Sequence, residues 1–111
     1  MAEAWDGNLG AEVEADGDDV HVTLVGEIDV ACSATMQRRL DEVSEFTDGA
    51  VVLDMSGVTF IDSTGIRVLV SVRRRLLDQR RSLILRNVSP QTQRVLDLTG
   101  LGTVLGVDGT T

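Results

Sequence analysis

The chain has 111 residues, of which 42% are apolar and 25% charged, and its formal net charge is −8. This length suits one domain that buries roughly two thirds of its unfolded surface in a single core. The acidic charge disfavours nucleic acid and anionic membrane surfaces as partners, because both bind basic proteins. No stretch approaches the roughly 20 apolar residues of a membrane span, and the acidic N-terminus is unlike a secretory signal. We therefore expect a soluble cytoplasmic protein.

The basic and sulfur-containing residues exclude further kinds of functional site. All ten basic residues are arginine, so the chain has no lysine for a Schiff base or a phosphate-binding loop. A single cysteine, Cys32, excludes an internal disulfide and a cysteine-based metal cluster. We interpret Cys32 as a small buried apolar residue.

The first predicted elements are two strands joined by a turn. Residues 11–15 alternate between apolar and polar and predict an edge strand. The cluster Asp-Gly-Asp-Asp that follows is typical of a hairpin turn. Val20, Val22 and Leu24 then give the next strand one fully apolar face.

A helix and the central strand come next. Met36, Leu40 and Val43 are spaced as one face of an amphipathic helix, which we place at residues 33–45. The run Val-Val-Leu-Asp-Met at residues 51–55 does not alternate, which is typical of a strand buried on both faces. We interpret Met-Ser-Gly at residues 55–57, which overlaps the last residue of this run, as a turn.

The tetrad Asp-Ser-Thr-Gly at residues 62–65 precedes a long apolar-periodic segment that predicts a helix at residues 63–79. Aspartate, serine and threonine are common where helices begin, because their side chains accept hydrogen bonds from the first free amides. Ser63 is therefore either a helix cap or a hydroxyl that another protein recognises, and the residues alone favour the cap. We expect any chemistry of the chain to lie here.

The last predicted elements are a short strand at residues 83–85, a helix at 90–98 and a final strand at 103–107. Ser89 is the expected N-cap of this helix, with Pro90 in its first position.

Strands separated by helical segments predict a single α/β domain with a partly parallel, mixed sheet of about four to five strands and about three to four helices. We expect the domain to span residues 11–107, between flexible tails at residues 1–10 and 108–111. Trp5 lies in the first tail and could instead fold back onto the domain, but we interpret the terminus as disordered.

Several enzyme arrangements are disfavoured, and we predict no catalytic residue. The one histidine, His21, lies mid-strand, and Ser63 is not in a Gly-x-Ser-x-Gly elbow, which argues against a hydrolase triad. Gly65 follows Asp62 by three residues, whereas the glycine of an aspartic protease motif follows by two. Asp54 is placed like the phosphoacceptor of a receiver domain, but receivers also need a lysine.

Asp29, Asp54 and Asp62 could together hold a hard cation such as magnesium or calcium. Each is explained more simply as a cap of a turn or of a helix start. We therefore predict no metal site.

Four segments, in this order, carry a resemblance to a known family: Val25-Gly26-Glu27-Ile28-Asp29, Val51-Val52-Leu53-Asp54-Met55-Ser56, Phe60-Ile61-Asp62-Ser63-Thr64-Gly65-Ile66 and Arg94-Val95-Leu96-Asp97-Leu98-Thr99-Gly100-Leu101. The chain resembles the STAS domain family, named for sulfate transporters and anti-sigma factor antagonists, and in particular the free-standing bacterial antagonists. The match covers most of the chain and implies a STAS-type fold.

The resemblance implies a phosphorylation-switched binding module. In this family the antagonist binds a serine-kinase anti-sigma factor and frees the sigma factor. The kinase inactivates the antagonist by phosphorylating the first hydroxyl residue after the aspartate, here Ser63, with Thr64 as the fallback, and a phosphatase restores it. ATP belongs to the kinase, so no cofactor is implied.

The resemblance also implies a partner-binding surface made of Asp29, Asp62, Ser63, Thr64, Gly65 and Arg67. Arg67 departs from the pattern, because free-standing antagonists often have a small residue there. The alternative is a STAS interaction module of another bacterial complex, of the lipid-transport or stressosome-like kind, that is not regulated by phosphorylation.

Overall fold

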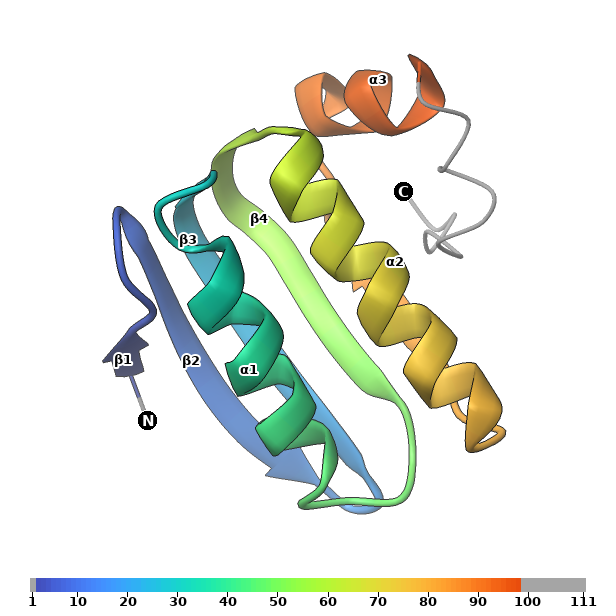
Figure 1. Ribbon diagram of the computed structural model, residues 1–111. Coiled ribbons are helices and arrows are strands. Elements are labelled where there is room, and N and C mark those ends of the chain that lie inside the picture. Colours follow the sequence, from blue (N-terminus) through green and yellow to red (C-terminus); the bar gives the residue numbers. More distant parts are fainter. Residues whose placement is uncertain (1, 99–111) are drawn as a thin grey trace.

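Five strands and three helices make up residues 2–98, the part of the chain that the computed structural model describes (Figure 1). In chain order they are β1 (Ala2–Ala4), β2 (Leu9–Asp16), β3 (Asp19–Ile28), α1 (Ser33–Ser44), β4 (Val51–Ile61), α2 (Ser63–Asp78), β5 (Leu83–Arg86) and α3 (Pro90–Leu98). The predicted α/β class with a mixed sheet is confirmed, and the three predicted helices end within one residue of their expected positions.

The strands lie in the sheet in the same order as in the chain, from β1 to β5. β1, β2 and β3 run antiparallel, and β3, β4 and β5 run parallel. The predicted hairpin turn is confirmed, because Asp16 pairs with Asp19 and two residues connect them. Gly17, the first of the two, has a φ of +61°, a conformation that glycine adopts without strain.

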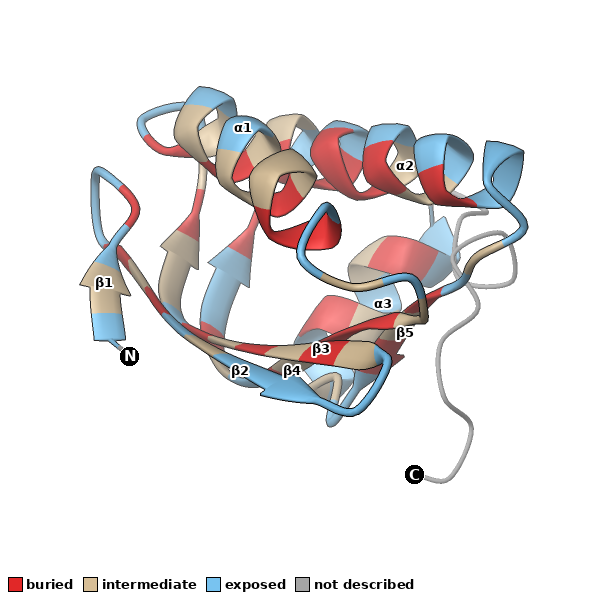
Figure 2. Cartoon of the chain, turned by 90° about the horizontal axis from the view of Figure 1, so that it is seen from below, coloured by how far each residue is buried: buried red, intermediate tan, exposed pale blue. Residues whose placement is uncertain are grey.

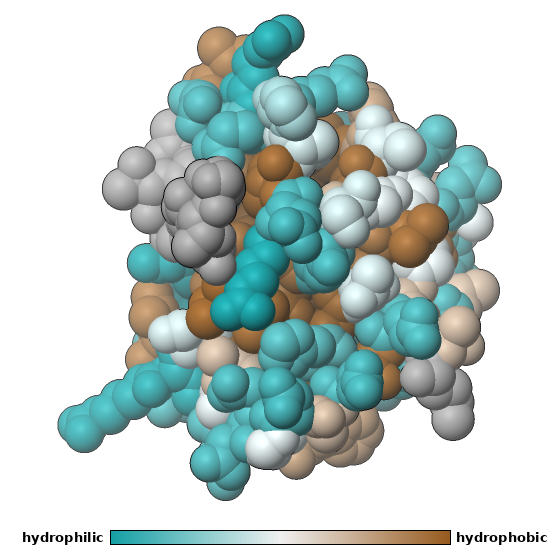
Figure 3. Space-filling model, turned by 180° about the vertical axis from the view of Figure 1, so that it is seen from behind, coloured by the Kyte–Doolittle hydropathy of each residue, from teal (hydrophilic) through white to brown (hydrophobic). Residues whose placement is uncertain are grey.

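Helices α1 and α2 lie side by side on one face of the sheet (Figures 1 and 2). The apolar stripes predicted for the two helices form the core against the sheet, and their buried side chains are Met36, Leu40, Val43, Ile66, Leu69, Val72 and Leu76. The opposite face of the sheet mixes apolar and polar side chains (Figure 3). Val25 and Phe60 are exposed there.

Strand β4 is longer than predicted, and the interpretation of Met55–Gly57 as a turn is wrong. Its pairing with β3 shifts register at two places, and at each place β4 has one residue more than β3. Such bulges bend a strand and interrupt its alternation. As a result the buried side chains Met55, Val58 and Ile61 follow one another at intervals of three rather than two.

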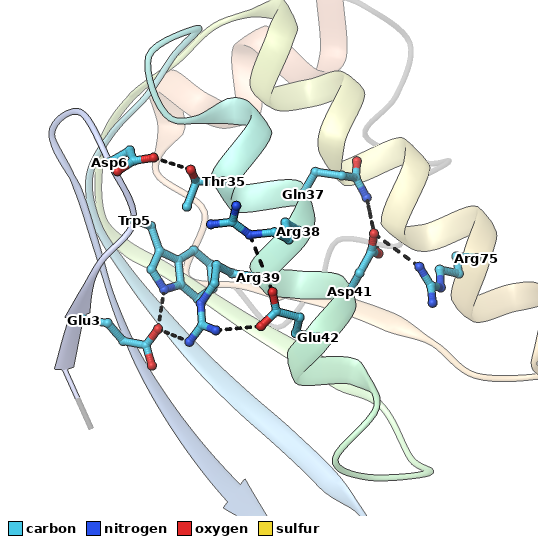
Figure 4. A network of polar contacts seen from close by, with 10 residues as sticks. All are labelled: Glu3, Trp5, Asp6, Thr35, Gln37, Arg38, Arg39, Asp41, Glu42 and Arg75. Atoms are coloured by element: carbon cyan, nitrogen blue, oxygen red, sulfur yellow. Dashed lines mark hydrogen bonds and ion pairs between the residues drawn. The ribbon is translucent and has the colours of Figure 1, made fainter.

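The N-terminus forms part of the sheet, which corrects the prediction of a flexible tail over the first ten residues. β1 pairs with β2, and Trp5 is fully buried. The Trp5 indole donates a hydrogen bond to Glu3, whose carboxylate also pairs with Arg39 of α1, while Thr35 of α1 donates to Asp6 (Figure 4). Burying a tryptophan removes a large apolar area from water, which offsets the entropy lost in ordering the terminus.

At the other end, α3 begins as predicted, because the Thr92 amide donates to the hydroxyl of Ser89 at 3.1 Å. The predicted strand at 103–107 and the tail at 108–111 lie outside the described residues. None of the helices that the structure describes is long and apolar enough to cross a membrane.

Candidate functional site

Two loops predicted to carry site residues meet at one edge of the sheet. Ile28 ends β3 and pairs with Ile61, which ends the parallel strand β4. The Asp62 amide donates to the Ile28 carbonyl at 3.1 Å, so the pairing continues one residue beyond β4. Because the carboxyl ends of parallel strands share an edge, Asp29 and Asp62 follow their strands into the same region.

Asp62 is the N-cap of α2. Its carboxylate accepts hydrogen bonds from the Thr64 hydroxyl at 2.5 Å, the Thr64 amide at 2.9 Å and the Gly65 amide at 3.3 Å. The hydroxyl bond above all, and then the two amide bonds, hold the pKa of Asp62 below its ordinary value. The carboxylate is therefore ionised at neutral pH, and the stability that this cap contributes is lost only as the pH falls through that lowered pKa.

Ser63 occupies the first position of α2 and is not its cap, which corrects the interpretation that the residues alone favoured. Its side chain is exposed, and within residues 2–98 its hydroxyl makes no hydrogen bond. The neighbouring Thr64 hydroxyl is half-buried and donates to Asp62. Of the two hydroxyls at this helix start, Ser63 is thus the accessible one.

Gly65 allows α2 to begin close against the sheet. A methyl group built on Gly65 would lie 2.9 Å from Cγ1 of Ile61 and closer still to Cγ2 of Ile28, and both isoleucines are buried. These branched side chains sit at the strand ends that carry the two loops. The glycine therefore sets how near the helix start comes to both loops.

Substituting Gly65 with alanine should lower the free energy of unfolding by about 1–3 kcal/mol, because the added methyl overpacks this contact. Urea unfolding followed by circular dichroism measures the change. Ser63→Ala is the matched control at an exposed position two residues away, and it should alter stability by less than about 0.5 kcal/mol. Equal urea midpoints for Gly65→Ala and the unmodified protein would show that the helix start accommodates the added methyl group without loss of stability.

The loop after β3 is a tight turn organised by Asp29. The half-buried Asp29 carboxylate accepts from the Ala31 amide at 3.0 Å, and its carbonyl accepts from the amides of Cys32 and Ser33 at 3.2 and 3.0 Å. Val30, at the tip of this turn, is 74% exposed. The turn thus presents one carboxylate and one apolar side chain next to the start of α2.

Cys32 lies beneath the two loops, buried as predicted. Burial raises the pKa of its thiol, and the carboxylates of Asp29 and Asp62 raise it further. A neutral thiol is a poor nucleophile. Cys32 therefore packs as a small apolar residue under the site.

Arg67 lies one turn into α2 beyond Ser63. Its side chain is exposed and forms no ion pair within residues 2–98. The guanidinium is therefore available at the same surface as the Ser63 hydroxyl.

Asp54 does not join the other two aspartates. It pairs with Thr23 in the middle of β3, and its carboxylate accepts from the Ser56 amide at 2.9 Å and the Asn87 side chain at 3.2 Å. In the described part of the chain, no three acidic, histidine or cysteine side chains group as metal ligands would. The alternative of a cation held by all three aspartates thus lacks one of its ligands.

Val30 is the surface residue that sequence reasoning missed. A single valine in a loop between a strand and a helix belongs to no apolar repeat, so the sequence does not show whether its side chain is buried. The one available signal was its position directly after Asp29 in a turn, where few side chains can be buried.

A family model described as the STAS domain matches residues 11–110. An anti-sigma-B factor antagonist of Bacillus subtilis is 31% identical over 101 residues, which cover 90% of this chain and 91% of that protein. Among solved structures, an anti-sigma factor antagonist from Mycobacterium paratuberculosis aligns with a TM-score of 0.77 and 26% identity, over 92% of this chain and 86% of its own.

The phosphorylated form of the Bacillus cell fate determinant SpoIIAA also aligns, with a TM-score of 0.67 and 21% identity, over 90% of this chain and 92% of its own. At this identity the likeness concerns the fold.

Proposed function

The chain belongs to the STAS domain family, and from that membership we propose that it is an anti-sigma factor antagonist. In this role it binds a serine-kinase anti-sigma factor and thereby releases the sigma factor. The observation that carries the proposal is the Ser63 side chain, which is exposed and free of hydrogen bonds at the start of α2. Relatives that align over most of their length are anti-sigma factor antagonists.

The proposed switch is phosphorylation of Ser63 by the anti-sigma factor itself. An acceptor hydroxyl must reach the γ-phosphate of the kinase's ATP, and Ser63 is accessible whereas Thr64 is bonded to Asp62. Thr64 is therefore the weaker acceptor. A phosphatase acting on phospho-Ser63 resets the switch. The chain is then a kinase substrate and not an enzyme, holds no cofactor, and works in the cytoplasm.

The proposed docking surface consists of the Asp29 turn and the start of α2, with residues Asp29, Val30, Asp62, Ser63, Thr64 and Arg67. Gly65, which the resemblance also implied, is buried and contributes by letting the helix start lie close to the strands. The pairing of Ile28 with Ile61, the residues that precede the two loops, supports this proposal, and the exposed Val30 would add an apolar contact beside the charged groups. Interfaces combine such a desolvated apolar contact with a polar rim.

The proposal is tested by capturing the partner with the tagged protein from a lysate of the source bacterium and identifying it by mass spectrometry. The purified partner is then incubated with the protein and ATP, and the phosphopeptide is mapped. A serine-kinase anti-sigma factor that modifies Ser63 is the expected result. A stable partner that places phosphate on neither Ser63 nor Thr64 would instead indicate a STAS interaction module without a phosphorylation switch.

Replacing Asp29 with alanine should weaken partner binding or slow phosphorylation at least several-fold, because a charged group of the docking surface is lost. Stability should change little: the carboxylate makes one exposed hydrogen bond, to the Ala31 amide, and we expect the melting temperature to fall by no more than about 4 °C. Asp29→Asn is the matched control, since its amide oxygen can keep that bond while the charge is removed. If Asp29→Ala unfolds the domain, Asp29 is a structural cap and not an interface residue.

A further inference from the structure

The Ser63 hydroxyl and the Arg67 guanidinium are neighbours on the exposed face of α2. They are four residues apart, a spacing that puts two side chains on the same side of a helix with their Cβ atoms about 5–6 Å apart. Both side chains are exposed. Their position next to the loop edge makes the pair part of the proposed docking surface.

Arg67 differs from the arginines that stabilise the fold. Arg38, Arg39 and Arg75 each form ion pairs with carboxylates, most of them between helices or with β1. Arg67 has no such partner among the described residues, and neither have Arg73, Arg74 and Arg80, although the chain carries a net charge of −8. What sets Arg67 apart from these arginines is its place one turn beyond Ser63, within reach of an anion carried by that hydroxyl.

We propose that this anion is the phosphoryl group on Ser63, and that Arg67 binds it within the same chain. The inference rests on the proposed function, since it takes Ser63 as the modified residue. It adds a regulatory role for Arg67 in the modified state.

The chemistry of the pair supports this assignment. Guanidinium matches phosphate oxygens with two parallel hydrogen bonds, which are stronger than bonds between neutral groups. An acidic group four residues before a basic one is also the favourable orientation on a helix. The neighbouring carboxylates of Asp62 and Asp29 repel the phosphate, so a cation one turn away offsets part of that repulsion.

One consequence follows for the switch. In the unmodified protein the Arg67 side chain is available to an acidic group of the partner. Once it holds the phosphate, it is withdrawn from that contact. Phosphorylation would thus add a phosphate at Ser63 and at the same time withdraw the Arg67 guanidinium from the partner.

The test places phosphoserine at position 63 during translation and titrates the phosphate by phosphorus NMR. The charged groups of the proposed docking surface are Asp62, Asp29 and Arg67, and the two aspartates are the same in every variant. Arg67 favours the dianion, so Arg67→Gln should raise the midpoint of the second phosphate ionisation by about 0.2–0.4 pH units. In addition, the side-chain N–H resonance of Arg67 should move on phosphorylation.

Arg74→Gln is the matched control. Arg74 is exposed on the same helix and lies 11 residues beyond Ser63, or roughly 16 Å along the axis. That distance exceeds the screening length of about 8 Å at physiological salt, so this variant should leave the midpoint unchanged. Melting curves of both variants verify that the fold is retained.

Equal midpoints for Arg67→Gln and the unsubstituted phosphoprotein, or equal shifts for both variants, would overturn the proposal. Because the phosphate is installed without a kinase, this result is independent of whether the anti-sigma factor modifies Ser63. A partner that phosphorylates neither Ser63 nor Thr64 refutes the proposed function, whereas an unchanged midpoint refutes the role of Arg67.

Discussion

Phosphorylation of Ser63 is expected to lower the affinity for the anti-sigma factor about 100-fold or more while leaving the fold intact. The phosphoryl group adds about −1.5 to −2 charges at neutral pH. A helix N-terminus tolerates such a group, so we expect little unfolding. The binding surface does not tolerate the added charge, because Asp62 is adjacent and the Asp29 turn lies at the same edge.

The size of the effect follows from electrostatics. At about 6 Å and an effective dielectric constant of about 20, one like-charge pair costs roughly 2–3 kcal/mol, and a loss of about 2.7 kcal/mol is 100-fold in affinity. The partner must also desolvate the phosphate in a surface shaped for a neutral hydroxyl. Arg67 offsets only part of this cost, since a helical ion pair contributes about 0.2–0.5 kcal/mol.

Calorimetric titration of the partner into five forms of the protein measures this loss of affinity. The Ser63→Ala form should bind within a few-fold of the unmodified one and resist phosphorylation, whereas the phosphoserine and Ser63→Asp forms should bind weakly. Ser71→Asp is the matched control, since Ser71 is exposed on the same helix two turns further on. Tight binding by the phosphoserine form would contradict the switch.

Replacing Trp5 with alanine is expected to lower the free energy of unfolding by about 3–5 kcal/mol, the usual range for a large buried aromatic. Trp5 belongs to the core, although it lies in the first few residues. The Arg39 guanidinium stacks 6.0 Å from its ring centre. The indole bond to Glu3 above all, and then Arg39, lower the pKa of Glu3, so that the carboxylate in this network is ionised at neutral pH.

Urea unfolding followed by circular dichroism tests this, because the variant lacks the one tryptophan that fluorescence would report. Trp5→Phe is the control that keeps an aromatic ring and gives up the hydrogen bond, and it should lose clearly less stability than the alanine variant. A loss below about 1 kcal/mol for Trp5→Ala would mean that the N-terminal strand contributes little and that the prediction of a flexible tail was right in energetic terms.

Sequence reasoning succeeded where one periodicity governs a segment. Both long helices were located from apolar residues at helical spacing, because each packs a single stripe on the sheet. It failed in β4, where two bulges replace the alternation of a strand by intervals of three, and residues 55–57 then read as a turn. It also failed at Trp5, whose burial depends on contacts with α1 far along the chain.

The location of the candidate site could be predicted from the sequence, but the hydrogen bonding at the start of α2 could not. The position of Asp29 and Asp62 at one edge follows from parallel strands that each lead into a helix. Which residue caps α2 did not follow, because three neighbouring side chains can all accept from helix amides. The backbone decides it: Asp62 is extended and Ser63 is already helical, so the aspartate reaches the amides and the serine hydroxyl stays free.

The strand order of the sheet bears on how the protein is made. Each strand pairs with the one that precedes it in the chain. A nascent chain leaving the ribosome can therefore add every new strand to an open edge, without separating a pair that has already formed. The antiparallel β1–β2–β3 unit can assemble first from short-range contacts, and β4 and β5 join later, each after its crossover helix. The docking edge, which needs the ends of both β3 and β4, would then be completed only after the N-terminal half has emerged.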